Sequence, residues 1–259
     1  MDNWFDTTLL PSLPRFALIA GIVCVAGFMR GFVGFGAALI TVPTLSLLIG
    51  PLVAVPVSTI IGLPAALQLL PEAVRHCERS VVLPIAMSVL LATPVGALLL
   101  VNIDPDVMKI IISLLVIVMV VMLARGWTLG HSVGRHVLIG AGVVGGLVQG
   151  SAGVGGPPVV AIALSRPGEP RQQRANVLGV MTAVVVASYL PFWYHGLLSS
   201  KVLLLGCSLI PFSFVSTWLG SHYFSRGGQG HYRSSALLIL ASVGIGALLL
   251  AVRDYLHGA

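Results

Sequence analysis

The chain has 259 residues, of which 57% are hydrophobic and only 8% are charged, and its formal net charge is +6. Soluble domains carry about a quarter charged residues, so this sequence has too little charge to cover a water-facing surface, and we predict a polytopic membrane protein surrounded by lipid. Its basic residues are scattered among loops, which argues against a nucleic-acid partner, and its three cysteines lack metal-ligand spacing.

Apolar segments of membrane-spanning length follow one another along the whole chain. A spanning helix needs about 20 mostly apolar residues. With charged loops as boundaries, four such segments precede the loop at 125–136 and four follow it. We therefore predict an all-helical fold in two repeats, residues 1–125 and 126–259. The predicted segments are 16–49, 52–70, 81–100, 107–124, 137–165, 175–193, 201–221 and 234–252.

Two glycine motifs interrupt the first and the fifth segment. The first motif, RGFVGFGAALITVP, begins with Arg30, the one charged residue inside segment 16–49. Glycine permits backbone angles that end a helix and lets a ligand approach the backbone closely. The repeated spacing predicts a broken helix at each place, with both breaks contributing to one binding site. The glycines are Gly31, Gly34 and Gly36 in the first motif and Gly150, Gly153, Gly155 and Gly156 in the second.

The distribution of basic residues predicts the orientation of the chain. Most of the fourteen Lys and Arg residues lie in four loops, which the positive-inside rule places in the cytoplasm. Two of these loops are separated by the single segment 137–165, which must therefore enter the membrane, turn at its glycines and leave on the same side. Its arms are too short for full crossings at 1.5 Å per residue. The four loops are 71–80, 125–136, 166–174 and 222–233.

The same interpretation of segment 16–49 places the N-terminus outside. The two halves then have opposite orientations and form inverted repeats, each with a re-entrant helix, an architecture common among secondary transporters. A single long tilted helix over 16–49 is the alternative.

Arg30 is the most informative single residue. A charge at membrane depth is costly and usually faces a cavity or a partner. All carboxylates lie in loops or tails, so we expect the substrate to supply the counter-ion of Arg30. The alternative is that Arg30 extends to the interface or donates to loop carbonyls.

Anion binding is also expected of the broken helices themselves. New helix starts near Gly36–Ala37 and Gly155–Pro157 would present backbone N–H groups and the positive end of a helix dipole to the gap. Small-residue packing between helices is the alternative interpretation of the glycines. Nearby polar side chains could add donors, although each could instead bond its own helix or a neighbouring one. The candidate substrate-binding residues are Arg30, Gly31, Gly34, Gly36, Ser58, Thr59, Gln149, Ser151, Gly153, Gly155, Gly156 and Asn176.

The sequence lacks residues that several classes of membrane protein require. The sequence has no Walker loop, no paired intramembrane carboxylates, no Ser/His/Asp grouping at membrane depth and no cysteine–histidine metal pattern. We therefore expect no enzyme activity, no catalytic residue, no metal site and no cofactor.

The two motifs, GFVGFGAALITVP and GLVQGSAGVGGPPVV, resemble the paired glycine-rich signatures of the TauE/SafE sulfite exporter family. The resemblance extends over nearly the whole chain, including VPVSTIIG at 55–62 and RANVLG at 174–179. It implies export of sulfite or organosulfonate anions across the bacterial inner membrane by a protein of two related halves. The chain departs from the family pattern at Arg30, Ala37, Ala38 and Pro158, which bears on the substrate more than on the fold.

These observations together predict a secondary transporter that exports a small oxyanion, sulfite or an organosulfonate, by alternating access between the two halves. Two alternatives remain open at this point: a passive anion channel, and a membrane assembly protein without a substrate.

Overall fold

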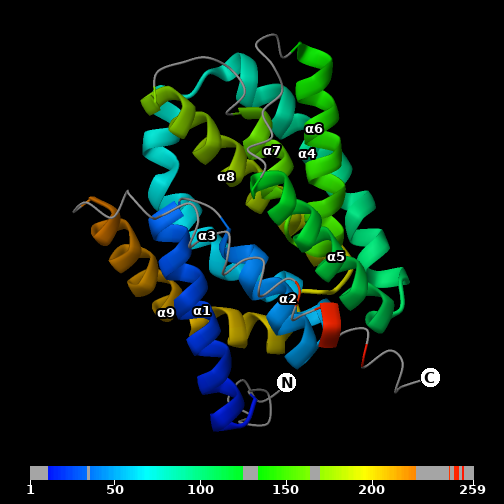
Figure 1. Ribbon diagram of the computed structural model, residues 1–259. Helices are drawn as coiled ribbons and strands as arrows, with labels where there is room; N and C mark the ends of the chain where they lie inside the picture. The colour runs from blue at the N-terminus through cyan, green and yellow to red at the C-terminus, as the bar shows by residue number, and fades with distance from the viewer. Residues whose placement is uncertain are drawn as a thin grey trace.

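The computed structural model describes residues 11–33, 36–124, 134–163 and 170–225, together with 245, 248–250 and 253. Within these residues the regular structure is entirely α-helical (Figure 1), which confirms the predicted all-helical class. The predicted segment 234–252 lies almost wholly outside the described residues, as does Gly34. The helices are α1 (Leu13–Val33), α2 (Ala37–Ile49), α3 (Pro51–His76), α4 (Arg79–Asn102), α5 (Pro105–Ala124), α6 (Arg135–Ala152), α7 (Gly156–Ala163), α8 (Pro170–Tyr194) and α9 (Ser200–Ser225).

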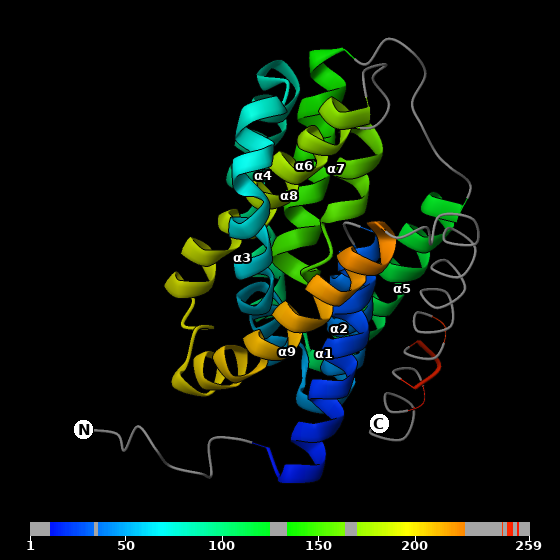
Figure 2. The ribbon, with the colours of Figure 1, turned by 90° about the vertical axis from the view of Figure 1, so that its left-hand side faces the viewer.

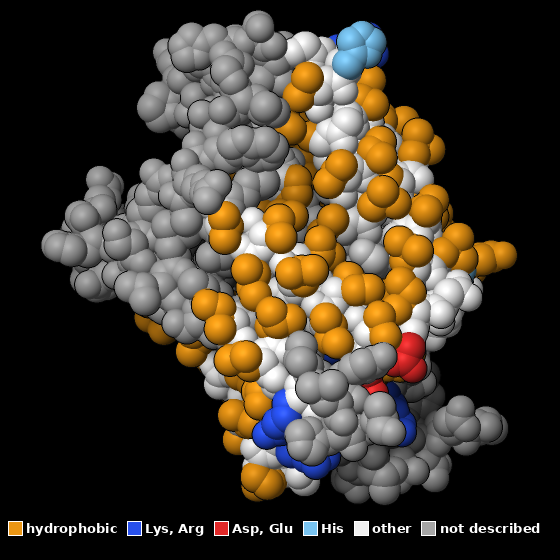
Figure 3. Space-filling view, turned by 45° about the vertical axis from the view of Figure 1, so that its right-hand side comes forward, with side chains coloured by type: hydrophobic (Ala, Val, Ile, Leu, Met, Phe, Trp, Pro, Cys, Tyr) orange, Lys and Arg blue, Asp and Glu red, His pale blue; other side chains and the backbone are white. Residues whose placement is uncertain are grey.

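The surface of the described part is apolar over most of the helical region. Figure 3 shows hydrophobic side chains spread across the visible face, with Lys and Arg gathered near its lower edge. Large side chains such as Leu91, Leu190 and Trp193 are at least two-thirds exposed, a pattern that fits lipid rather than water as the surrounding solvent. In the described residues, four helices are long and apolar enough to cross a membrane: Leu13–Gly31, Arg79–Asn102, Ala175–Tyr194 and Ser200–Gly220.

The helix is interrupted at both glycine motifs. α1 ends at Val33 and α2 begins at Ala37, directly after Gly36, whose φ is 96°. α6 ends at Ala152, and Gly153, with φ 66°, leads into α7. Both angles lie in the left-handed region, where glycine has no steric penalty. Residues 16–49 therefore form two helices rather than one long helix.

After its interruption, α7 folds back along α6. A Cβ built on Gly145 would lie 2.4 Å from Cγ2 of Val159, and one built on Gly155 would lie 2.1 Å from the carbonyl oxygen of Gly145. Only glycine lets the two helices approach this closely, since any side chain would occupy the space of the neighbouring helix. Figure 2 shows α6 and α7 side by side.

Two contacts place the starts of α4, α6 and α8 relative to one another. Near the start of α6, Leu138 packs in one buried cluster with Val81 and Ile85 of the first turns of α4. Near the start of α8, Oδ1 of Asn176 accepts a hydrogen bond of 2.7 Å from the backbone N–H of Glu78, at the junction of α3 and α4. The starts of α4, α6 and α8 therefore lie together at one end.

The most extensive helix contacts join each interrupted helix to a helix of the other half of the chain. α6 packs on α4, and α1 packs on α9. Both contacts depend on glycine: a Cβ on Gly150 would lie 2.2 Å from the carbonyl oxygen of Thr93, and one on Gly27 would lie 2.1 Å from Oγ of Ser216. α3 and α8 contact each other between these two pairs.

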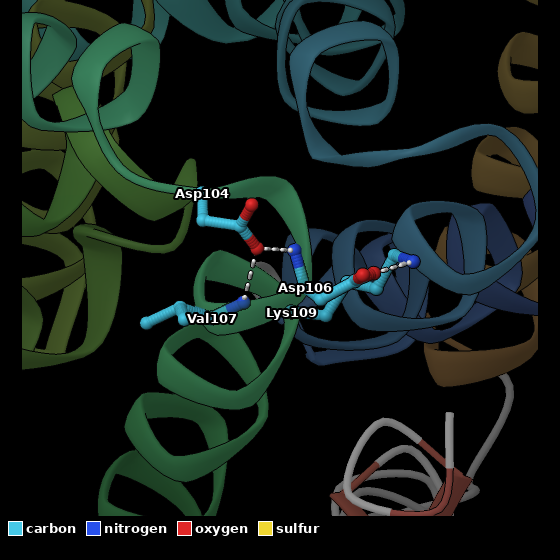
Figure 4. Close-up of polar contacts among 4 residues, drawn as sticks. All are labelled: Asp104, Asp106, Val107 and Lys109. Carbon is cyan, nitrogen blue, oxygen red and sulfur yellow. Dashed lines mark hydrogen bonds and ion pairs between the residues drawn. The ribbon is translucent and has the colours of Figure 1, made fainter. Parts of the chain in front are cut away.

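A carboxylate fixes the start of α5. Oδ1 of Asp104 accepts hydrogen bonds from the backbone N–H groups of Asp106 (2.9 Å) and Val107 (3.3 Å) (Figure 4). Pro105, at the first helical position, has no N–H that needs a partner. One helical turn further, Nζ of Lys109 lies 2.6 Å from Oδ1 of Asp106. Asp104 is thus an N-cap of the usual kind.

We expect Asp104→Ala to lower the free energy of unfolding by about 1 kcal/mol, because two N–H groups at the start of α5 lose their acceptor. The measurement is the apparent melting temperature in detergent. Asp104→Asn is the matched control, since its side-chain oxygen accepts the same bonds and should retain most of the stability. Equal melting temperatures for Asp104→Ala and the unmodified protein would contradict the assignment of the cap.

Candidate functional site

A cavity of about 60 Å³ lies where both glycine interruptions meet. Residues of α1, α2, α3, α6, α7, α8 and α9 line it, together with the loop that joins α6 to α7. Gly36 faces it from the first interruption, and Gly153 faces it from the second. Among the described residues there is no group of His, Cys, Asp or Glu side chains that could hold a metal ion. The cavity is thus bounded by residues of both interruptions.

Arg30 is the one charged residue among the described residues that line the cavity. It lies in the last turn of α1, and its Nη1 would be 3.4 Å from a Cβ built on Gly62 of α3. The absence of a side chain at Gly62 leaves room for the guanidinium group. Among the described residues no carboxylate forms an ion pair with Arg30. The ion pair found in that part of the chain joins Lys109 to Asp106 of α5. The cavity consequently carries an unbalanced positive charge, and an anion would neutralise it.

The start of α2 forms the wall next to Arg30. Gly36, Ala37 and Ala38 line the cavity, and the N–H of Leu39 already donates to the carbonyl of Gly36 at 3.0 Å. The N–H groups of a first helical turn have no acceptor within their own helix, and the helix dipole makes this end positive. The start of α2 and Arg30 therefore place two sources of positive potential on one wall.

Gln149 organises the second interruption. Its side chain is 4% exposed; Oε1 accepts from the N–H of Gly155 at 3.2 Å, and Nε2 donates to Oγ of Ser188 at 3.1 Å. The Ser188 hydroxyl in turn donates to the carbonyl of Val184 within α8. The amide of Gln149 thus ties the end of the loop to α8.

The second helix start has fewer free backbone donors than the first. The N–H of Gly155 is already bonded to Gln149, and Pro157 and Pro158, which follow Gly156, have no N–H. The start of α7 therefore offers fewer N–H groups to the cavity than the first turn of α2.

Two hydroxyl groups of α3 reach the cavity with different bonding. Oγ1 of Thr59 donates to the carbonyl of Val55 at 3.1 Å within its own helix. Oγ of Ser58 is buried and has no hydrogen-bond partner among the described residues. Buried polar atoms in proteins nearly always have a partner, so the free hydroxyl of Ser58 is available to a bound molecule.

The structure brings together most, but not all, of the predicted site residues. The cavity is lined by Arg30, Gly36, Ser58, Thr59, Gln149, Gly153 and Gly156. Four others are not among its lining residues: Gly31, Ser151, Gly155 and Asn176. Ser151 donates to the carbonyl of Leu147 in its own helix, and Asn176 accepts from Glu78 at the helix junction described above. Gly34 lies outside the described residues.

Sequence reasoning missed the contribution of α9. Ser213 lines the cavity because it lies against Gly27 across the contact between α1 and α9. Met181 of α8, which packs on Gly156, was missed for the same reason. No local motif marks either residue, since both reach the site through contacts between distant parts of the chain.

We expect Ser58→Ala to weaken substrate binding without weakening the fold. A net hydrogen bond contributes about 1 kcal/mol, which corresponds to about a fivefold rise in the apparent KM for the transported anion. The melting temperature should be unchanged or slightly higher, since the substitution removes a buried hydroxyl that has no partner. Ser113→Ala is the control, because the buried Ser113 hydroxyl donates within α5 and lines no part of the cavity. An unchanged KM would exclude contact between Ser58 and the substrate.

Comparison with known proteins gives two matches. A family model described as "Sulfite exporter TauE/SafE" matches residues 19–247, a range that includes both glycine motifs and every residue lining the cavity. A protein of Cupriavidus necator named "Probable sulfite/organosulfonate exporter TauE" is 24% identical over 250 residues, which cover 94% of this chain and 96% of that protein. No solved structure matches.

Proposed function

This chain belongs to the sulfite exporter TauE/SafE family, and from that premise we propose that it is a secondary transporter that exports a small oxyanion, sulfite or an organosulfonate, across the bacterial inner membrane. The observation that carries the proposal is the cavity between the two helix interruptions, in which Arg30 is the only charged residue among the described lining residues. A cation would be repelled from this cavity, whereas an anion would gain a counter-ion there.

The proposed substrate contacts follow from the groups that line the cavity. The guanidinium of Arg30 provides charge and forked donors suited to an oxyanion. Ser58 provides a hydroxyl, and the first turn of α2, beginning after Gly36, provides N–H groups. Thr59, Gly153 and Gly156 shape the remaining wall. We assign Gly31, Ser151, Gly155 and Asn176 to holding the loops and helices in place rather than to touching the substrate.

Alternating access would arise from movement of one half of the chain, 1–125, against the other, 126–259. Two features support inverted repeats. α1 begins at the lower end of Figures 1 and 2, whereas α6 begins at the upper end. The pairing of α1 with α9 also corresponds to that of α6 with α4, each joining an interrupted helix to the third segment of the other half. Binding between broken helices is the arrangement found in many secondary transporters.

The proposed orientation places the loops 71–80, 125–136, 166–174 and 222–233 in the cytoplasm, and makes α6 and α7 a re-entrant pair. The shared end of α4, α6 and α8 supports this orientation, because it puts the residues preceding α6 and those preceding α8 on one side. An inside-negative membrane potential would then favour outward movement of the anion.

The experiment that tests the proposal is uptake of labelled sulfite by proteoliposomes containing the full chain. A carrier gives saturable uptake, and unlabelled sulfite on the opposite side accelerates exchange of the label. Flux that rises linearly with concentration and shows no exchange would indicate a passive anion channel. Absence of flux for sulfite and for every sulfonate tried would refute transport and favour an assembly role.

A further inference from the structure

The two glycine motifs differ at the one position that sets the charge of the site. The sequences RGFVGFG (30–36) and QGSAGVG (149–155) have glycines at the same three places, so Arg30 and Gln149 occupy equivalent positions. Both residues line the cavity. One interruption therefore contributes a cation and the other a neutral amide.

The residues around Arg30 and Gln149 add to the difference in charge between the two interruptions. Arg30 has no carboxylate partner in the described part of the chain, and it lies near the donor-bearing start of α2. Gln149 uses Oε1 for the N–H of Gly155 and Nε2 for Ser188. The two prolines after Gly156 remove further donors from the second wall. All the positive potential that we identify in the cavity thus comes from the first interruption.

We infer that the site accepts oxyanions of single negative charge and discriminates against dianions of similar shape. Gln149 holds the second loop in place through its two hydrogen bonds and adds no charge to the site. The inference rests on the proposed function and specifies its substrate class: hydrogensulfite and sulfonates rather than sulfate or fully deprotonated sulfite. A monoanion would be neutralised by Arg30. A dianion would leave one uncompensated negative charge in a cavity whose other described lining side chains are uncharged, and a buried unpaired charge is strongly unfavourable.

The first test uses the unmodified protein in proteoliposomes and measures inhibition of labelled methanesulfonate uptake by unlabelled anions. Methanesulfonate remains a monoanion over the usable pH range, sulfate remains a dianion, and sulfite changes from one to the other near neutral pH. We expect sulfate to inhibit at least about tenfold more weakly than unlabelled methanesulfonate. Inhibition by sulfite should weaken as the pH rises, whereas inhibition by methanesulfonate should not change.

The second test changes the charge of the second loop. Gln149→Arg adds a cation at the position equivalent to Arg30, and we expect it to increase inhibition by sulfate relative to that by methanesulfonate by about tenfold. Gln149→Met is the matched control, because it removes both hydrogen bonds of the Gln149 side chain without adding charge. It should reduce uptake while leaving the ratio of inhibition by sulfate to inhibition by methanesulfonate unchanged. The series on the unmodified protein requires no variant, so the test does not depend on how these variants fold.

The outcomes separate the two levels of the proposal. Equal inhibition by sulfate and methanesulfonate at every pH would overturn monoanion selectivity and leave oxyanion transport standing. Failure of the chain to transport any sulfite or sulfonate would overturn the proposed function itself, and the charge selectivity with it.

Discussion

Arg30→Gln is expected to reduce oxyanion uptake by at least about 30-fold. Removing one partner of a buried charge pair costs about 2–5 kcal/mol, and the lower value already corresponds to about a 30-fold loss in affinity. Among the residues that the structure describes, Arg30 is the only charged one lining the cavity, so none of the other described lining side chains can take over its role. The measurement is initial uptake of sulfite and methanesulfonate by proteoliposomes containing equal amounts of protein.

Two further variants show whether the loss comes from charge at this position. Arg30→Lys keeps the positive charge but loses the planar fork of donors, so we expect partial uptake with a higher KM. Arg15→Gln makes the same substitution on the same helix at an exposed residue, and uptake should be unchanged. The melting temperature of Arg30→Gln should not fall, because the substitution removes a partly buried charge that has no carboxylate partner among the described residues. Wild-type uptake by Arg30→Gln would exclude Arg30 from the site.

Gly150→Ala is expected to destabilise the whole protein more than any other single methyl group added along α6. A Cβ at this position would lie 2.2 Å from the carbonyl oxygen of Thr93 and 2.6 Å from the backbone N of Ala97. These are backbone atoms of α4 and cannot rotate away, so α4 and α6 must separate. Overpacking of this kind costs about 1–3 kcal/mol or more, and the displacement would also move the neighbouring Gln149.

Gly140→Ala provides the matched control on the same helix. A Cβ there would have no heavy atom within 4 Å, and alanine has the higher helix propensity by about 1 kcal/mol. We expect its melting temperature in detergent to be equal to or above that of the unmodified protein, whereas Gly150→Ala should melt earlier and aggregate during purification. Similar melting temperatures for the two variants would show that α4 and α6 relax without loss of stability.

In the described part of the chain, the sequence alone determined the helical segments and the positions of the two interruptions, since both depend on local properties. Length and apolarity of a run decide whether it can span a bilayer. The recurring glycines marked the places where α1 and α6 end, because left-handed backbone angles at Gly36 and Gly153 require glycine. Arg30 was found by the same local reasoning, as a charge inside an apolar segment without an acidic neighbour.

Only the tertiary structure decided which polar groups are free to meet a substrate. Ser58 and Asn176 were equally good candidates in sequence, yet the hydroxyl of Ser58 lies unpaired at the cavity while Asn176 accepts from the N–H of Glu78. The side-chain amide of Gln149 can donate and accept hydrogen bonds, but in the structure its oxygen already accepts from the N–H of Gly155 and its nitrogen donates to Ser188. The availability of a hydrogen-bonding group depends on partners that are distant along the chain, and long-range packing brings those partners together.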